Sequence, residues 1–153
     1  MTDPQERRRL FDVAAEGYDR LMGRYLPSLG PAFADAAGVA SGQHALDVGC
    51  GPGGLTTVLS DRLGPEAVSA IDPSPPFVAA CRRRHPEVDV REGVAEELPF
   101  PSDSFDVTLA CLVVGFMTDP ARGVQEMRRV TRPGGTVALC FWHLERMPLL
   151  ATF

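Results

Sequence analysis

The sequence lacks the long apolar segments that mark a membrane span or a secretory signal. Its longest apolar run, residues 107–117, is too short to cross a bilayer, which takes about 20 apolar residues. Residues 1–10 are polar and charged where a signal peptide needs an apolar core. We therefore expect no export and no association with a membrane.

Cysteines are few, and no two of them form the CxxC pair that zinc sites and redox enzymes use. They lie far apart in the chain, at Cys50, Cys81, Cys111 and Cys140. This scatter argues against a zinc site and against a disulfide framework. We expect reduced thiols, no bound metal and a cytoplasmic location.

Positive charge is also in short supply. The formal net charge is −5, whereas binding of nucleic acid or an anionic membrane requires clustered Lys and Arg. Two runs of three arginines, residues 7–9 and 82–84, fall on expected helices and are interpreted as solvated helix faces. With 153 residues, 44% hydrophobic and 23% charged, the chain has the composition of one globular domain without nucleic-acid partners.

The first 40 residues are predicted to be helical and to form a lid. Apolar residues recur at spacings of three and four between residues 10 and 25, which places them on one stripe of a helix. The segment 27–31, with a proline at each end, is expected to break this helix. Residues 32–37 are predicted to form a second short helix that ends at Gly38. Residues 41–153 are expected to complete the same single domain.

After residue 40, strands and helices alternate, which predicts an α/β fold. The predicted strands are residues 44–48, 67–71, 88–91, 105–114 and 136–142. The predicted helices are residues 55–63, 75–84 and 120–130, with a left-handed Gly64 ending the first and Ser74 capping the second. Residues 132–135 are read as a turn. Such alternation implies right-handed crossovers and a parallel sheet.

Ligands of such sheets bind beyond the carboxyl ends of the strands, where the first strand runs into a glycine-rich turn. The spacing of residues 49–54 fits a dinucleotide site, so spacing alone does not choose the ligand. Asp47 precedes this turn, and its carboxylate would repel a pyrophosphate but attract a ligand with an ammonium and a sulfonium. Pro52 removes a backbone donor that a phosphate would use. Charge therefore favours a cationic ligand.

A second carboxylate, Asp72, ends the second strand. At this position it can accept hydrogen bonds from both hydroxyls of a ribose. The alternative role is to cap the following helix, for which Ser74 is better placed. Since NAD and S-adenosylmethionine share the ribose, Asp72 supports an adenosine ligand without choosing between the two.

Together these segments resemble class I S-adenosylmethionine-dependent methyltransferases, and in particular the ubiquinone and menaquinone biosynthesis type. Residues 47–53 are similar to motif I of that family, and residues 92–107 resemble the stretch that joins its third and fourth strands. Residues 132–135 resemble the turn before its fifth strand. The resemblance implies a Rossmann-like doubly wound sheet in the order 3-2-1-4-5, S-adenosylmethionine as cofactor, and methyl transfer to a small-molecule acceptor.

The resemblance also implies roles for individual residues around the glycine turn. Asp47, Gly49 and Gly51 would hold the methionine end of the cofactor. Asp72 would bind the ribose, and Pro73 would lie beside the adenine.

Further along the chain, the resemblance assigns residues to the adenine and to the sulfonium. Val94 and Ala95 would present their backbone to the adenine edge, with Glu96 adjacent. Relatives often carry an acidic residue at the position of Val94, and Glu96 is the substitute acceptor. Cys111 and Leu112 would line the floor near the sulfonium.

On the first helix, Tyr18 would close over the cofactor as a lid, with core packing as its alternative role. No catalytic residue is assigned. Methyl transfer is an in-line displacement in which the cofactor supplies the reactivity and the protein supplies alignment. Some relatives have a histidine at the position of Gly115, so a base role does not carry over. His143 is the histidine expected at the ligand-facing edge.

The family's sheet usually continues past the fifth strand with a helix and two antiparallel strands, whereas this sequence ends in an apolar tail at residues 147–153. We therefore expect a domain that lacks those C-terminal strands. Its fifth strand would be an open edge, which a second copy or another chain could complete.

Three functional hypotheses follow from the sequence. The first is a methyltransferase, the second is a non-catalytic or truncated module that binds S-adenosylmethionine, and the third is a nicotinamide-dependent oxidoreductase. Asp47 argues against the third. Calorimetry with S-adenosylhomocysteine and with NAD separates it from the other two.

Overall fold

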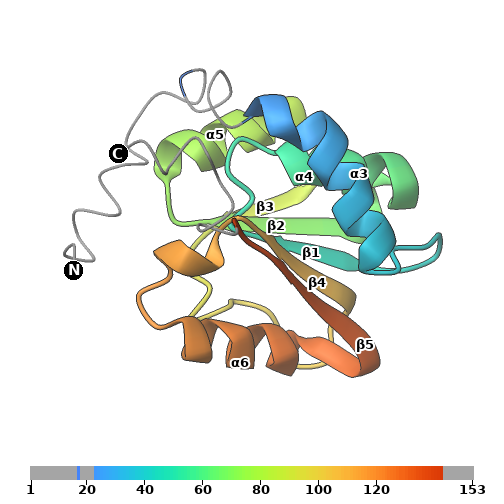
Figure 1. Cartoon of the computed structure of the whole chain (residues 1–153), viewed down its shortest axis with the longest axis vertical. Helices are drawn as coiled ribbons and strands as arrows, with labels where there is room; N and C mark the ends of the chain where they lie inside the picture. The colour runs from blue at the N-terminus through green and yellow to red at the C-terminus, as the bar shows by residue number, and fades with distance from the viewer. Residues whose placement is uncertain (1–16, 18–22, 143–153) are drawn as a thin grey trace.

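A computed structural model describes residue 17 and residues 23–142, so the predictions for residues 1–16, 18–22 and 143–153 lie outside the described residues. Five parallel strands form one sheet in the order β3-β2-β1-β4-β5 (Figure 1). The strands are β1 (Ala45–Val48), β2 (Val68–Asp72), β3 (Asp89–Glu92), β4 (Phe105–Cys111) and β5 (Thr131–Cys140). The predicted α/β class and strand order are confirmed.

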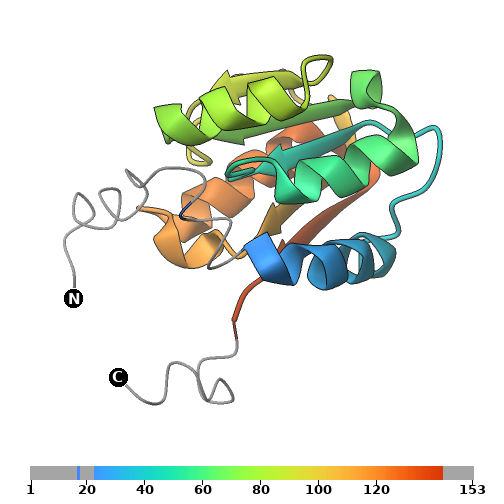
Figure 2. The same ribbon diagram turned by 90° about the horizontal axis from the view of Figure 1, so that it is seen from above.

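Helices cover both faces of this sheet. One face carries the helices α3 (Leu26–Ala36), α4 (Gly54–Leu63) and α5 (Pro75–Arg84), which lie above the sheet in Figure 1 and face the viewer in Figure 2. The opposite face carries α6 (Pro120–Val130). No helix within the described residues is long and apolar enough to cross a membrane.

The central strands β1, β2 and β4 are apolar because they are buried on both faces. In β1, Ala45 packs into the core under α3, α4 and α5, whereas the neighbouring residues Leu46 and Val48 pack into the core on the α6 side. This alternation follows from the two-residue period of a strand. It explains why nearly continuous apolar runs, and not an apolar–polar alternation, indicated these central strands.

The first described helix differs from the prediction. The expected break at residues 27–31 is wrong, because α3 runs without interruption from Leu26 to Ala36 and contains Pro31. Pro27 lies in the first turn, where its missing N–H costs nothing. The helix packs on α4 so closely that a Cβ on Gly30 would lie 2.9 Å from Val58 Cγ2. Tertiary packing therefore outweighs the local effect of Pro31, whose carbonyl also accepts a hydrogen bond from Arg62.

Two helix ends also differ from expectation. Gly64 ends α4 with a positive φ of 86°, but its ψ of 142° is extended and not left-handed helical. A short 3-10 helix, η2 (Pro65–Ala67), follows and delays the start of β2 by one residue. Ser74 occupies the N-cap position of α5, but its side chain forms no capping hydrogen bond. Asp72 Oδ1 instead accepts a hydrogen bond from the Ser74 N–H at 2.9 Å.

The fourth strand ends three residues earlier than predicted. Leu112, which follows β4, has a φ of 63°, and this left-handed conformation turns the chain out of the sheet. The N–H of Leu112 donates to the carbonyl of Cys140 at 2.7 Å, which fixes the turn to β5. The 3-10 helix η3 (Val114–Phe116) follows. An apolar run does not reveal this reversal, because its residues suit a strand or a buried turn equally well.

The fifth strand begins five residues earlier and ends two residues earlier than predicted. Its register jumps from the pair Phe105–Thr131 to the pair Val107–Thr136, so the residues read as a turn form a bulge inside β5. Asp106 lies opposite this bulge and forms an ion pair with Arg132. The bulge is tight, since a Cβ on Gly135 would lie 2.6 Å from the Asp106 carbonyl oxygen.

This contact generates a prediction about Gly135. We expect Gly135→Ala to lower the free energy of unfolding by about 1–3 kcal/mol, because a backbone atom cannot move aside as a side chain can. Gly115→Ala is the matched control, since a Cβ there would meet nothing within 4 Å. Urea unfolding of both variants checks the prediction. Equal stability of the two would contradict it.

Candidate functional site

A cavity of about 260 Å³ opens at the carboxyl ends of β1, β2 and β4, where the topology predicts a ligand. Most of the residues predicted from the sequence to bind a cofactor line it. They are Gly49, Gly51, Asp72, Pro73, Val94, Ala95, Glu96, Cys111 and Leu112. Of the other two, Asp47 lies in an adjoining pocket, and Tyr18 lies outside the described residues.

Sequence reasoning missed a set of mostly apolar residues that line the same cavity. They are Ile71, Ser74, Phe77, Gly93, Val113, Phe116, Met117 and Thr118. Four of them follow β4, and the predicted strand, residues 105–114, includes only Val113 among these four. The turn at Leu112 brings these side chains to the cavity, and an apolar pattern by itself gives no signal for that turn.

The glycine turn after β1 is held by backbone hydrogen bonds. The N–H groups of Gly49 and Cys50 both donate to the Ile71 carbonyl, at 2.8 and 3.1 Å. Gly49 and Gly51 have positive φ values of 72° and 55°, which glycine adopts without strain. Because two of the N–H groups in the turn are already bonded to β2, fewer donors remain to cradle a phosphate. This geometry agrees with the sequence-based preference for a cationic ligand.

Asp72 joins the glycine turn to the start of α5. Its Oδ2 accepts from the Gly51 N–H at 2.8 Å, and its Oδ1 accepts from the Ser74 N–H at 2.9 Å. The side chain is 6% exposed, and burial raises the pKa of Asp72 to about 6 against these two hydrogen bonds. A carboxylate has about four lone-pair sites, so it keeps acceptor capacity toward the cavity.

Asp47 is buried beneath the glycine turn, at the N-terminus of α4. Its Oδ2 accepts from Thr56 Oγ1 at 2.7 Å. It is 1% exposed, and burial raises the pKa of Asp47 to about 7, with the hydrogen bonds from Thr56 opposing and the charge of Asp72 adding to the rise. Its pocket shares Gly49, Cys111 and Leu112 with the larger cavity, so the two spaces adjoin.

Neither of these two carboxylates has an ion-pair partner within the part of the chain that the structure describes. Burying a carboxylate without a counter-ion is costly, and the raised pKa values of Asp47 and Asp72 express that cost. A bound cation would lower it. The site is therefore electrostatically suited to a positively charged ligand.

The C-terminal end of α5 holds the outer side of the glycine turn. Arg84 donates to the Pro52 carbonyl at 3.0 Å. The Nε2 atom of His85 lies 3.2 Å from the Gly53 carbonyl and 3.1 Å from Thr57 Oγ1. A Cβ on Gly53 would lie 2.9 Å from the His85 ring. These contacts give part of the arginine run and His85 a structural role in shaping the turn.

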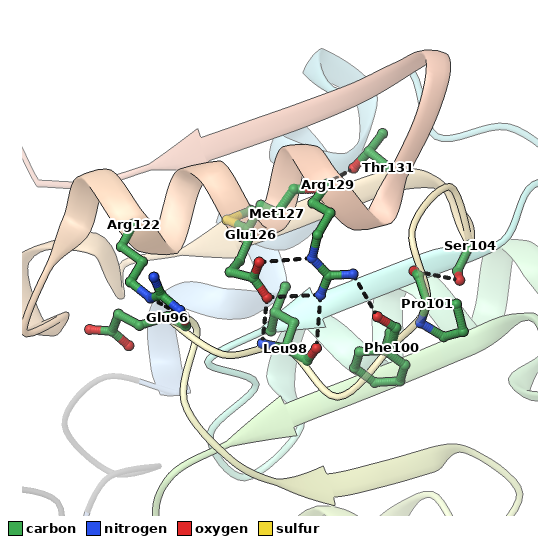
Figure 3. A network of polar contacts seen from close by, with 10 residues as sticks. All are labelled: Glu96, Leu98, Phe100, Pro101, Ser104, Arg122, Glu126, Met127, Arg129 and Thr131. Carbon is green, nitrogen blue, oxygen red and sulfur yellow. Dashed lines mark hydrogen bonds and ion pairs between the residues drawn. The ribbon is translucent and has the colours of Figure 1, made fainter.

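A polar network fixes the opposite wall of the cavity to α6 (Figure 3). Glu126 and Arg129 form an ion pair at 2.8 Å, which lowers the pKa of Glu126. Arg129 donates to the carbonyls of Leu98 and Phe100, and Glu126 accepts from the Leu98 N–H. The loop after β3 is therefore held against α6 without a helix of its own.

Glu96 belongs to this same wall, and its carboxylate is engaged there. Its Oε1 accepts from the N–H groups of Thr118 and Asp119 at 2.6 and 3.1 Å. Its carbonyl accepts from Arg122 Nε at 2.8 Å (Figure 3). The expectation that Glu96 substitutes as an adenine acceptor therefore competes with a role in anchoring the loop before α6.

Residues 46–139 match the family described as a methyltransferase domain. The chain belongs to this family. S-adenosylmethionine is the cofactor that membership implies.

Curated relatives of this methyltransferase domain carry methyltransferase names. A demethylmenaquinone methyltransferase of Chlorobaculum parvum is 33% identical over 94% of this chain and 62% of its own length. An uncharacterized methyltransferase of Mycobacterium tuberculosis is 38% identical over 84% of this chain and 50% of its length. A probable phthiotriol/phenolphthiotriol dimycocerosates methyltransferase of Mycobacterium ulcerans is 39% identical over 64% of this chain and 39% of its length. The chain thus spans about half the length of these relatives.

Solved structures share the fold of this methyltransferase domain. A SAM-dependent methyltransferase from Aquifex aeolicus has a TM-score of 0.73 at 22% identity, covering 97% of this chain and 77% of that one. The [4+2]-cyclase SpnF has a TM-score of 0.66 at 28% identity, covering 72% of this chain and 43% of that one. The fold is therefore shared with a protein that is named as a cyclase.

The buried Asp47 generates a prediction about stability and pH. Its pKa is raised to about 7 in the folded state, from 3.8, so the folded chain binds more protons than the unfolded chain between these values. The free energy of unfolding should then fall as pH rises through this window, with Asp47 contributing up to one proton to the slope and Asp72 adding to it below about pH 6. Denaturant titrations from pH 4.5 to 7 check the slope. Asp47→Asn should reduce it, and an unchanged slope in that variant would contradict the assignment.

A second prediction concerns Thr56, whose hydroxyl donates to Asp47. Thr56→Val keeps the shape but removes the donor, so it should destabilise the chain by about 1–3 kcal/mol when Asp47 is ionised. The loss should be greater at pH 8 than at pH 5. Thr56→Ser keeps the donor, and its smaller loss should not change with pH. Parallel behaviour of the two variants across this range would show that Thr56 only fills space.

Proposed function

We propose that this chain binds S-adenosylmethionine and transfers its methyl group to a small-molecule acceptor. The observation that carries this proposal is the pair of buried carboxylates, Asp47 and Asp72, which flank one glycine turn without a basic partner among the described residues. S-adenosylmethionine brings an ammonium and a sulfonium to such a site. Family membership supports the same cofactor.

The two adjoining spaces divide the cofactor between them. We place the adenosine in the larger cavity, where Asp72 retains lone pairs for the ribose hydroxyls and the backbone of Val94 and Ala95 lies near the adenine. The amino-acid end extends toward the smaller pocket that Asp47 lines. Cys111 and Leu112 line both spaces, so they lie where the sulfonium would join the two parts of the cofactor.

When bound, S-adenosylmethionine supplies an electrophilic methyl group on sulfur. The chain's own contribution is alignment and the exclusion of water. Well-oriented reactants can recover about 7–11 kcal/mol of the barrier, and the apolar residues after β4, which include Val113, Phe116 and Met117, provide a dry wall. We assign no general base. Tyr18 is proposed as a lid over the cofactor, as the resemblance to the family implies.

We propose an acceptor with an apolar body. Phe116 lines the cavity and is nevertheless 44% exposed, which suits a contact with a bound molecule. The names of three relatives specify phthiotriol/phenolphthiotriol dimycocerosates, demethylmenaquinone and 2-methyl-6-phytyl-1,4-hydroquinone.

We propose a cytoplasmic location, because a reducing compartment suits the four free cysteines.

A second candidate function is a non-catalytic or incomplete cofactor-binding module that needs another chain. Within the described residues, β5 is an edge strand, and Leu139 in it and Phe141 directly after it are exposed. Edge strands with exposed apolar side chains favour pairing with a further strand. A second copy or another chain could therefore complete the acceptor site.

Calorimetry tests the proposed cofactor. We expect binding of S-adenosylmethionine and S-adenosylhomocysteine and no binding of NAD. Asp72→Asn should weaken binding about tenfold or more, since hydrogen bonds to a charged group contribute about 1.5–3 kcal/mol. Glu87→Gln is the matched control. This exposed residue precedes β3 and therefore lies at the amino ends of the strands, away from the cavity at their carboxyl ends. Binding of NAD alone would overturn the proposal.

The pH dependence of binding provides an independent check. The affinity for S-adenosylmethionine should rise from about pH 5.5 to about pH 7.5, because Asp72 and Asp47 ionise over this range and attract the cation. Product formation with a panel of acceptors then separates the two candidate functions. If the chain binds the cofactor but forms product only after a partner chain is added, the second candidate function is favoured.

A further inference from the structure

Cys111 and Cys140 occupy paired positions on the neighbouring strands β4 and β5. They are Cα partners in the register of this parallel pair. Neighbouring strands lie about 4.7–4.9 Å apart, and disulfides join Cα atoms that are about 4.4–6.8 Å apart. The backbone separation therefore permits a bond between the two sulfur atoms.

The two thiols also lie on the same face of the sheet. Both pack against the core beneath α3, α4 and α5, as side chains of register partners in a parallel pair should. Leu139, one residue earlier, is on the opposite face. The Cys111 thiol is close enough to interact with the Cys140 thiol, and burial raises the pKa of Cys111. Both side chains are free and partly exposed.

The position of this pair connects it to the cavity. Cys111 lines the larger cavity and the adjoining Asp47 pocket. The next residue, Leu112, lines both as well, and its N–H is bonded to the carbonyl of Cys140. A covalent bond between the two sulfur atoms would therefore constrain the floor shared by the two spaces.

We propose that Cys111 and Cys140 form a site of reversible oxidative modification, at which a peroxide converts the two thiols to a disulfide and weakens binding in the cavity. The effect on binding rests on the proposed function, whereas formation of the disulfide does not. The proposal assigns to the pair a chemistry that the methyl transfer does not use.

The reaction balances with one peroxide. The sulfur of Cys140, on the edge strand, attacks one oxygen of hydrogen peroxide, and the O–O bond breaks. Water is released, and Cys140 becomes a sulfenic acid. The Cys111 sulfur then attacks the Cys140 sulfur, the S–O bond breaks, and a second water leaves. The two thiols lose two hydrogens and two electrons in total, and the peroxide is reduced to two waters.

The location of the pair explains why the bond would be reversible. Both thiols are partly exposed, one on the wall of the cavity and the other on the neighbouring strand β5, so a reductant can reach the bond. Exposed disulfides are reduced readily, which is the property of a regulatory bond and not of a structural one.

Peroxide treatment of the reduced, purified chain tests the proposal. Peptide mapping should find a Cys111–Cys140 disulfide, and calorimetry should show an affinity for S-adenosylhomocysteine that is lower by at least about fivefold, a typical size for coupling between sites. A dithiol reductant should restore the affinity. Bound S-adenosylhomocysteine should slow formation of the disulfide, because coupling between two sites is reciprocal.

Two variants make the test specific. Cys140→Ser should abolish both the disulfide and the loss of affinity. Cys140→Ser combined with Leu139→Cys moves the thiol by one residue to the other face of β5, and it should form no disulfide with Cys111. Far-UV circular dichroism of each variant confirms that it has folded.

The outcomes separate the two proposals. A disulfide between Cys50 and Cys81 in place of Cys111–Cys140, or over-oxidation of unpaired thiols, would overturn the assignment of the site. A Cys111–Cys140 disulfide with unchanged affinity would overturn its effect on binding. If the reduced chain fails to bind S-adenosylhomocysteine, the proposed function fails, while peptide mapping still decides whether the disulfide forms.

Discussion

The cavity depends on the pairing of β1 between β2 and β4. This arrangement sets the carboxyl ends of three strands side by side, although they are far apart in the sequence. The hydrogen bond from the Gly51 N–H to Asp72 crosses from the turn after β1 to the end of β2 and ties the first two strands at the mouth of the cavity. Most cavity-lining residues take their positions from this edge of the sheet or from the loops that leave it, and Phe77 takes its position from α5.

The charge of the site has an energetic cost that its proposed function explains. Asp47 and Asp72 are buried, and their raised pKa values mean that the folded chain resists their ionisation. A purely structural position would be filled more stably by an apolar or neutral side chain. Retaining two carboxylates there is reasonable if a cationic ligand compensates them. Stability without ligand and affinity for ligand therefore oppose each other at this site.

The two sides of the cavity are stabilised in different ways. On the β1–β2 side, backbone hydrogen bonds and the contacts of His85 and Arg84 with the glycine turn restrict its movement. On the other side, Glu126 and Arg129 hold the loop after β3 to α6. Between them lies the end of β4, where Cys111 and Leu112 contact β5. This floor connects the cavity to the edge strand, which is why we infer that chemistry at β5 would affect ligand binding.

The sequence by itself determined which segments form strands of a parallel sheet, and its resemblance to a known family implied their spatial order and about half of the cavity lining. The apolar pattern of a strand can be recognised within the segment itself. The glycine turn and Asp72 directly follow two strands whose carboxyl ends must meet at one edge of a parallel sheet. Tertiary structure alone decided the rest. Packing on α4 keeps α3 helical through Pro31, and a bulge opposite Asp106 absorbs residues that read as a turn. The left-handed Leu112 brings a missed apolar wall into the cavity, because contacts between segments distant in sequence select among conformations that are locally almost equivalent.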